Sequence, residues 1–195
     1  MIEHNIIELF PKPVLVVDNI CIDKLDQFEF IIHDIMNQRG TAVTDFQHVK
    51  STHATMCDLF NIVQFQPLVK EIQNFSYIFL ENLGYSAQSI DAMRLKQMWA
   101  NSSNQNDYLF PHIHSNSVVS GAFYVKASDT DCIQFYNDIT DTTLVPENLT
   151  TINQRSVDYP CKPGRLILFK SNLLHGTTVK KDMREKIVMS FNIGL

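Results

Sequence analysis

The segment FPHIHSNSVVSGAFYV, Phe110–Val125, places two histidines one residue apart, directly before an apolar run that ends in Phe-Tyr-Val. On a β-strand or at its exit, residues two apart project to the same face, so His112 and His114 can point at one atom. Such pairs also arise by chance, so the motif does not by itself establish a metal site. Further ligands have to come from the rest of the chain.

The apolar run belongs to a series of short strand-like segments. From Met93 onward the chain contains AMRLKQMWA, SVVSGAFYV, CIQFY, RLILF and KIVMSFNI, separated by Asn, Asp, Ser, Pro and Gly clusters. Many short strands in one stretch favour a β-barrel or β-sandwich. We therefore predict a mainly β core over residues 91–195.

The preceding part of the chain reads as helical. PVLVVDN predicts one short strand, and IDKLDQFEFIIHDIMNQRG has apolar residues at helical spacing with Gly40 as a stop signal. PLVKEIQNFSYIFLENLGY repeats the pattern up to Gly84. We expect two helices that pack on the outside face of the core. Without a linker or repeat, one domain over 1–195 is predicted, with helix-rich support over 1–90 and the metal site in 91–195.

Composition limits the classes of function. The 195 residues are 45% hydrophobic and 19% charged, which is typical of a soluble globular protein, and the formal net charge is −5. A chain with this charge and scattered Lys and Arg is not expected to bind nucleic acid in general. The N-terminus lacks a signal-peptide pattern, no segment is long enough to span a membrane, and the four cysteines lack metal-site spacing. We expect a cytoplasmic protein with free thiols that acts on a small-molecule or peptidyl substrate.

A third metal ligand is available in GRLILFKSNLLHGTTV, where His175 follows another strand-like run. It lies sixty-one residues after His114, which is too far for a zinc finger but suits a barrel in which distant strands converge. Three ligands on one face leave coordination positions for substrate or oxygen, as a catalytic site requires.

Two cations follow this histidine. Arg184 and Lys186 lie two apart in the segment REKIVMSFNI and would share one face of a strand. A cation projecting into a barrel interior is costly unless it is paired, so a bound carboxylate would explain it. The alternative is a solvated strand end together with the charged residues 180–182.

Five ordered motifs resemble a known family. Trp-x-Asn, Pro-His-x-His, Ser-Gly-x-x-Tyr-Val, Phe-x-Ser followed by His, and Ser-Phe-Asn occur in this order between Trp99 and Ile193. They resemble the 2-oxoglutarate/Fe(II)-dependent oxygenases of marine phages and bacteria, within the prolyl-hydroxylase-like superfamily. The resemblance implies a double-stranded β-helix, the jelly-roll or cupin-like core, with Fe(II), 2-oxoglutarate and O2 as cofactor and co-substrates. The resemblance also implies that the protein could be encoded by a phage and act in the cytosol of the host.

The resemblance also implies roles for single residues. His112 and His175 would ligate iron. His114 stands where the superfamily usually has a carboxylate, and it would either be a third ligand or stand aside. Tyr124 would hydrogen-bond 2-oxoglutarate, with a core tyrosine as the alternative. The family's arginine for the distal carboxylate of 2-oxoglutarate aligns with Lys186, which loses the bidentate geometry of arginine.

A few residues keep two interpretations. Arg184 could take over the role of Lys186. Asn101 and Asn192 could contact cofactor or substrate, or cap strand ends. Trp99 is expected in the core, and the remaining histidines, His4, His33, His48 and His53, are expected to be ordinary surface or core residues.

The leading prediction is therefore an Fe(II)- and 2-oxoglutarate-dependent oxygenase that hydroxylates a C–H bond and releases succinate and CO2. One alternative is a three-His cupin-type dioxygenase that needs no 2-oxoglutarate, for which the two cations would be superfluous. Another is a non-catalytic jelly-roll binding or structural protein. The N-terminal helices either support the barrel or form a homodimer interface.

Overall fold

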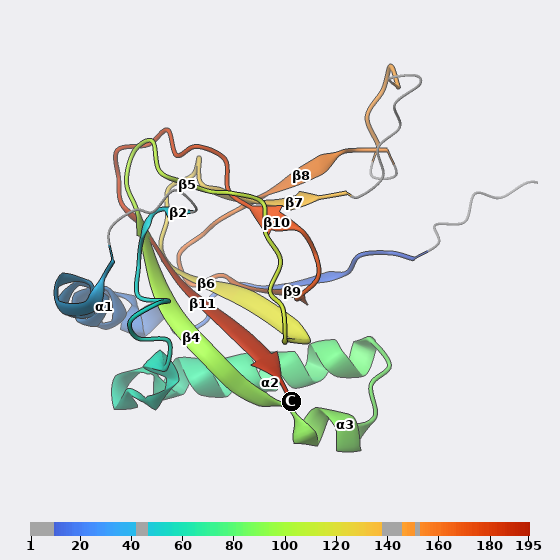
Figure 1. Cartoon of the computed structure of the whole chain (residues 1–195), viewed down its shortest axis with the longest axis horizontal. Coiled ribbons are helices and arrows are strands. Elements are labelled where there is room, and N and C mark those ends of the chain that lie inside the picture. Colours follow the sequence, from blue (N-terminus) through green and yellow to red (C-terminus); the bar gives the residue numbers. More distant parts are fainter. Residues whose placement is uncertain (1–9, 42–46, 138–145, 151–152) are drawn as a thin grey trace, which may run out of the picture.

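The computed structural model describes residues 10–41, 47–137, 146–150 and 153–195. Two antiparallel sheets face each other, and helices cover the outer side of the larger one (Figure 1). The main sheet has the order β1-β9-β6-β11-β4-β3, formed by β1 (Val14–Val17), β9 (Leu166–Lys170), β6 (Val119–Lys126), β11 (Lys186–Gly194), β4 (Arg94–Ser103) and β3 (Lys50–Ser51). The second sheet has the order β10-β7-β8, formed by β10 (His175–Gly176), β7 (Cys132–Tyr136) and β8 (Ser156–Pro160).

Smaller elements complete the described chain. A two-stranded ribbon pairs β2 (Gln47–His48) with β5 (Tyr108–Leu109). The helices are α1 (Leu25–Arg39), α2 (Gln66–Asn82) and α3 (Ala87–Ala92), with 3-10 turns η1 (Ile22–Lys24), η2 (Leu59–Asn61) and η3 (Val63–Phe65). Pro67 lies in the first turn of α2, where its missing N–H costs nothing, and Gly84 follows the helix with a φ of 84°.

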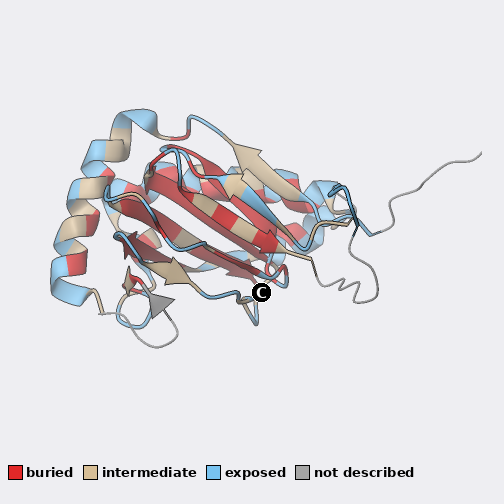
Figure 2. Cartoon of the chain, turned by 90° about the horizontal axis from the view of Figure 1, so that it is seen from above, coloured by how far each residue is buried: buried red, intermediate tan, exposed pale blue. Residues whose placement is uncertain are grey.

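Alternation along the main strands creates two cores. Phe123, Leu168 and Met189 face α1 and α2 and join the larger core, whereas Tyr124 and Phe169 face the second sheet. Because strand neighbours point to opposite faces, strands covered on both sides read as nearly continuous apolar runs. Figure 2 shows the buried strands enclosed between the outer elements. The space between the sheets holds the smaller core and the candidate site.

The predicted mainly β architecture with flanking helices is confirmed, and both long predicted helices are present. The N-terminal part contributes more than helical support, because β1 and β3 form the two edges of the main sheet. All four cysteines are free thiols, of which Cys161 is buried and the others half-buried. In the part of the chain that the structure describes, no helix is both long and apolar enough to cross a bilayer.

Candidate active site

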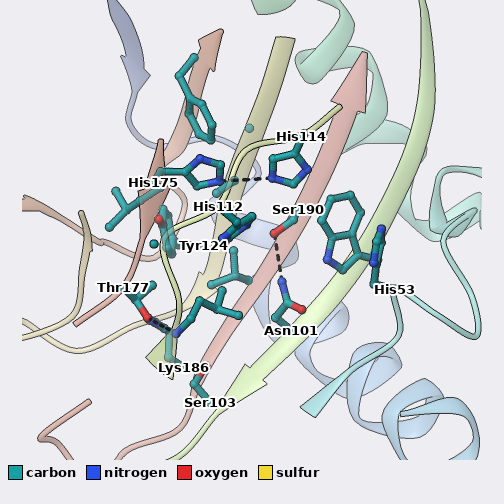
Figure 3. A pocket seen from close by; sticks show the side chains of 18 of the residues that line it. His53, Asn101, Ser103, His112, His114, Tyr124, His175, Thr177, Lys186 and Ser190 are labelled. Atoms are coloured by element: carbon teal, nitrogen blue, oxygen red, sulfur yellow. Dashed lines mark hydrogen bonds between the residues drawn. The ribbon is translucent and has the colours of Figure 1, made fainter. Parts of the chain in front are cut away.

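A cavity of about 180 Å³ opens between the two sheets, well above the ~10–15 Å³ that a single water molecule needs. Figure 3 shows three histidines at one end, Lys186 at the other, and Tyr124 between them. The cavity is lined by residues of β4, β6, β7, β9, β10 and β11 and of the loop between β5 and β6. Elements that are distant in sequence therefore converge on one chamber.

The loop between β5 and β6 carries two of the histidines. His112 forms a backbone bridge with His175 on β10, through N–H to O distances of 2.8 and 3.1 Å. The His114 N–H donates to the Ser171 carbonyl at 2.9 Å. Neither loop histidine lies in one of the named strands, so these backbone bonds, and not a strand repeat, bring the rings together. Ligand atoms of all three rings lie within 4.8 Å of one another.

Hydrogen bonds orient the imidazoles. His112 Nδ1 donates to the Phe110 carbonyl at 2.7 Å, and His175 Nδ1 donates to the Leu173 carbonyl at 2.8 Å. Both rings thus keep Nε2 as the free lone pair, which is the usual support of a metal-bound histidine. His114 Nε2 lies 3.2 Å from His175 Nε2, a distance at which a proton on His114 Nε2 meets the His175 lone pair. A metal ion would replace that proton, and the donor set fits Fe(II).

Burial keeps two of the clustered histidines neutral. Desolvation lowers the pKa of His175 to about 3 and that of His114 to about 4, with repulsion from His112 as the next cause. A metal ligand must be unprotonated, so both rings are ready to bind throughout the neutral pH range. These two rings therefore do not have to lose a proton from a charged imidazole before they bind a cation.

The far end of the cavity carries a buried cation. Lys186 is 5% exposed and is the first residue of β11. Among the described residues no carboxylate lies within salt-bridge distance of its ammonium group, and the cavity lining contains no acidic side chain. A buried and unpaired ammonium group is costly, so a ligand with a carboxylate would be stabilised at this end.

Tyr124 lies along the wall between the two ends (Figure 3). Burial raises the pKa of its hydroxyl well above the usual value, and the neighbouring Cys161 thiol adds to the effect through a hydrogen bond. The phenol is therefore a neutral hydrogen-bond donor and not a base. It lies on β6, opposite Val188 of β11, and both side chains line the cavity.

The structure separates the other predicted residues. Arg184 does not line the cavity: its side chain is 63% exposed and pairs with Asp182 at 2.8 Å, outside β11. Asn192 is buried but bonds Ser120 and Gln97 and does not line the cavity either.

Asn101 does line the cavity. Its amide donates to Ser190 Oγ at 3.1 Å, and its Oδ1 is buried without a partner among the described residues. An unpartnered buried acceptor of this kind is costly, and a small movement of the amide toward the cavity would let it meet a donor.

Two cavity residues were expected elsewhere from the sequence. Trp99, expected in the core, lies in the wall 5.7 Å from the His114 ring, centroid to centroid. His53 lies 4.5 Å from Trp99 on its other side. His53 has no paired spacing with the other histidines, and the pairing of β3 with β4, extended by the Thr52 bonds to Ala100, brings its segment to the cavity. His4 lies outside the described residues.

The sequence matches the family model described as "Putative 2OG-Fe(II) oxygenase" over residues 97–192. This segment of the chain is therefore similar to the 2-oxoglutarate/Fe(II) oxygenases. The match begins within β4, ends within β11, and so includes all three clustered histidines and Lys186. Among curated proteins, none matches this sequence closely enough to count as a relative.

Solved structures show the same fold at low identity. A prolyl-4-hydroxylase from Pseudomonas putida superposes with a TM-score of 0.63 and 9% identity over 94% of both chains. The viral collagen prolyl hydroxylase from Paramecium Bursaria Chlorella virus-1 superposes with a TM-score of 0.60 and 14% identity, over 93% of this chain and 96% of that one. HygX from Streptomyces hygroscopicus, solved with nickel and 2-oxoglutarate, superposes with a TM-score of 0.61 and 12% identity, over 94% of this chain and 83% of that one. The fold of this oxygenase is thus the predicted double-stranded β-helix.

Proposed function

We propose that this oxygenase hydroxylates a C–H bond of a small-molecule or peptidyl substrate, with release of succinate and CO2. The observation that carries the proposal is the presence, in one cavity, of three convergent imidazoles and a buried ammonium group without a carboxylate at salt-bridge distance among the described residues. The histidines suit a divalent iron ion, and the ammonium group suits the carboxylate of a co-substrate.

Each residue has a distinct task in this proposal. His112, His114 and His175 hold the ion, Lys186 binds the distal carboxylate of 2-oxoglutarate, and the Tyr124 hydroxyl donates a hydrogen bond to the same molecule. Bound Fe(II), with 2-oxoglutarate and O2, supplies the oxidation of the C–H bond.

The rest of the wall shields the site. Phe169 lies 4.5 Å from the His175 ring, centroid to centroid, and with Trp99 it lines the cavity. These apolar rings keep water away from the histidines and present an apolar surface to the substrate. Asn101, between Lys186 and the histidines in Figure 3, offers a hydrogen bond to co-substrate or substrate.

The site has three imidazoles where the superfamily usually has two imidazoles and a carboxylate. This ligand set leaves one alternative, a three-His dioxygenase that does not use 2-oxoglutarate. Lys186 favours the 2-oxoglutarate enzyme, because the alternative leaves this buried cation without a carboxylate in direct contact. Cytoplasmic location, a phage source and a homodimer stay predictions.

The decisive experiment is an anaerobic titration of the metal-free protein with Fe(II) and then 2-oxoglutarate, followed by the visible charge-transfer band of their chelate. We expect a band in the wild type, loss of the band in His175→Ala, and a retained band in His53→Ala, a histidine of the same cavity outside the cluster. A folded wild type without the band would contradict the proposal, as would a band that survives in His175→Ala.

A further inference from the structure

A second group of metal-ligating side chains lies on the helix-covered side of the main sheet. Glu29 and His33 are four residues apart on α1, so their side chains share one helix face. Glu185 approaches them from the segment directly before β11. Ligand atoms of the three side chains lie within 4.8 Å of one another.

The donor set is that of a transition-metal site. His33 Nε2 lies 2.8 Å from Glu185 Oε2, and the three side chains are partly covered, with exposures of 42% for His33, 23% for Glu185 and 28% for Glu29. One imidazole and two carboxylates suit Zn²⁺ or a similar ion, whereas Ca²⁺ and Mg²⁺ prefer oxygen ligands alone. The helix spacing of four residues is the spacing at which paired zinc ligands occur on helices.

Neighbouring groups already orient the carboxylates. The Ser102 hydroxyl on β4 donates to Glu185 Oε1, which leaves Oε2 turned toward His33. Hydrogen bonds of this kind commonly fix metal-binding carboxylates. Lys126 Nζ donates to Glu29 Oε1 at 2.6 Å and thus competes with a metal ion for this carboxylate. Its side chain is 39% exposed on a flexible stem, so it can leave toward solvent when a metal ion arrives.

We propose that Glu29, His33 and Glu185 form a second divalent metal site of the Zn²⁺ type, in which the ion takes the place of Lys126 as the partner of Glu29. The site would join α1 to the start of β11. Glu185 directly precedes Lys186 in the chain, so an ion there would also restrain the backbone that carries the cavity's cation. This site is separate from the three-His cluster and does not depend on the function proposed for it.

The test is a Zn²⁺ count and affinity measurement against a chromophoric competing chelator, on the full chain and its variants. We expect two ions in the wild type and one in His175→Ala. In the His175→Ala background, His33→Ala and Glu185→Gln should each weaken the remaining ion at least about tenfold, the effect expected of a lost metal contact. Glu81→Gln, an exposed glutamate on α2, should leave the count and affinity unchanged.

Lys126→Met gives a variant with the opposite expected sign. Because the lysine competes with the metal for Glu29, its removal should tighten Zn²⁺ binding in the His175→Ala background. If the three side chains form only an ion-pair network, His175→Ala should bind no Zn²⁺, or should bind it with an affinity that neither His33→Ala nor Glu185→Gln weakens. Either result overturns the inference. Circular dichroism checks that each variant is folded. If the wild type lacks the ion that His175→Ala should remove, the three-His site fails, and the second site is still tested by the remaining ion. The two proposals can therefore fail separately.

Discussion

Replacing Lys186 by methionine should selectively remove 2-oxoglutarate binding. The lysine is 5% exposed and lines the cavity, so its charge is poorly screened by water. Two unit charges 4 Å apart attract by about 4 kcal/mol at an effective dielectric constant near 20. Truncating one partner of a buried charged pair costs about 2–5 kcal/mol. The variant should therefore bind 2-oxoglutarate roughly 30- to 4000-fold more weakly, while metal affinity is unchanged because the histidines are untouched.

The assay can use the protein's own fluorophore. Trp99 is the single tryptophan and lies in the cavity wall, so its emission reports 2-oxoglutarate binding in an anaerobic titration with Mn²⁺ in place of iron. Arg184→Met is the matched control, because that exposed arginine pairs with Asp182 and should leave the affinity unchanged. If Arg184→Met weakened binding and Lys186→Met did not, the assignment of the carboxylate-binding end of the cavity would be wrong.

Two further predictions concern stability. The metal-free protein should lose stability as the pH falls below 6.5 toward about 3, because the unfolded chain takes up protons that the folded chain refuses at His114 and His175, whose pKa values are lowered to about 4 and about 3. The free energy of unfolding in urea should be lower at pH 5 than at pH 7.5 by up to about 2 kcal/mol for each histidine. Equal free energies at the two pH values in the wild type would contradict this reasoning. So would a His175→Asn variant that loses as much stability as the wild type. Lys180→Met should cost about 3–5 kcal/mol of unfolding free energy, because it leaves the Asp131 carboxylate buried without its partner at 2.8 Å. The double variant Lys180→Met/Asp131→Leu should recover most of the lost unfolding free energy in the same assay. An equal loss in the single and the double variant would argue against the buried, unpaired Asp131 carboxylate as the reason.

The sequence predicted the elements whose signals are local. Helical periodicity found α1 and α2, and continuous apolar runs found the long strands that are covered on both sides. The two-residue strands β2, β3, β5 and β10 escaped prediction, because each is defined by a partner far away in the chain and not by its own composition.

The histidine cluster was predicted, but for a different physical reason. A strand repeat would have placed His112 and His114 on one face, whereas both lie in a loop that a backbone bridge to His175 holds in place. The same repeat grouped Arg184 with Lys186, yet β11 begins at Lys186, so the arginine is outside the strand and in solvent. Spacing identified both cations as candidates, and the start of β11 explains why Lys186 lines the cavity and Arg184 does not.

The position of β11 has a consequence for how the molecule forms. It lies in the middle of the main sheet, paired with β4 on one side and β6 on the other, yet it comes after both in the chain (Figure 1). During synthesis at about 5–20 residues per second, β4 and β6 emerge with the edges that face each other still unpaired. Such edges invite pairing with other chains until the central strand inserts. Insertion of β11 also delivers Lys186, so closing the sheet and completing the pocket are the same event.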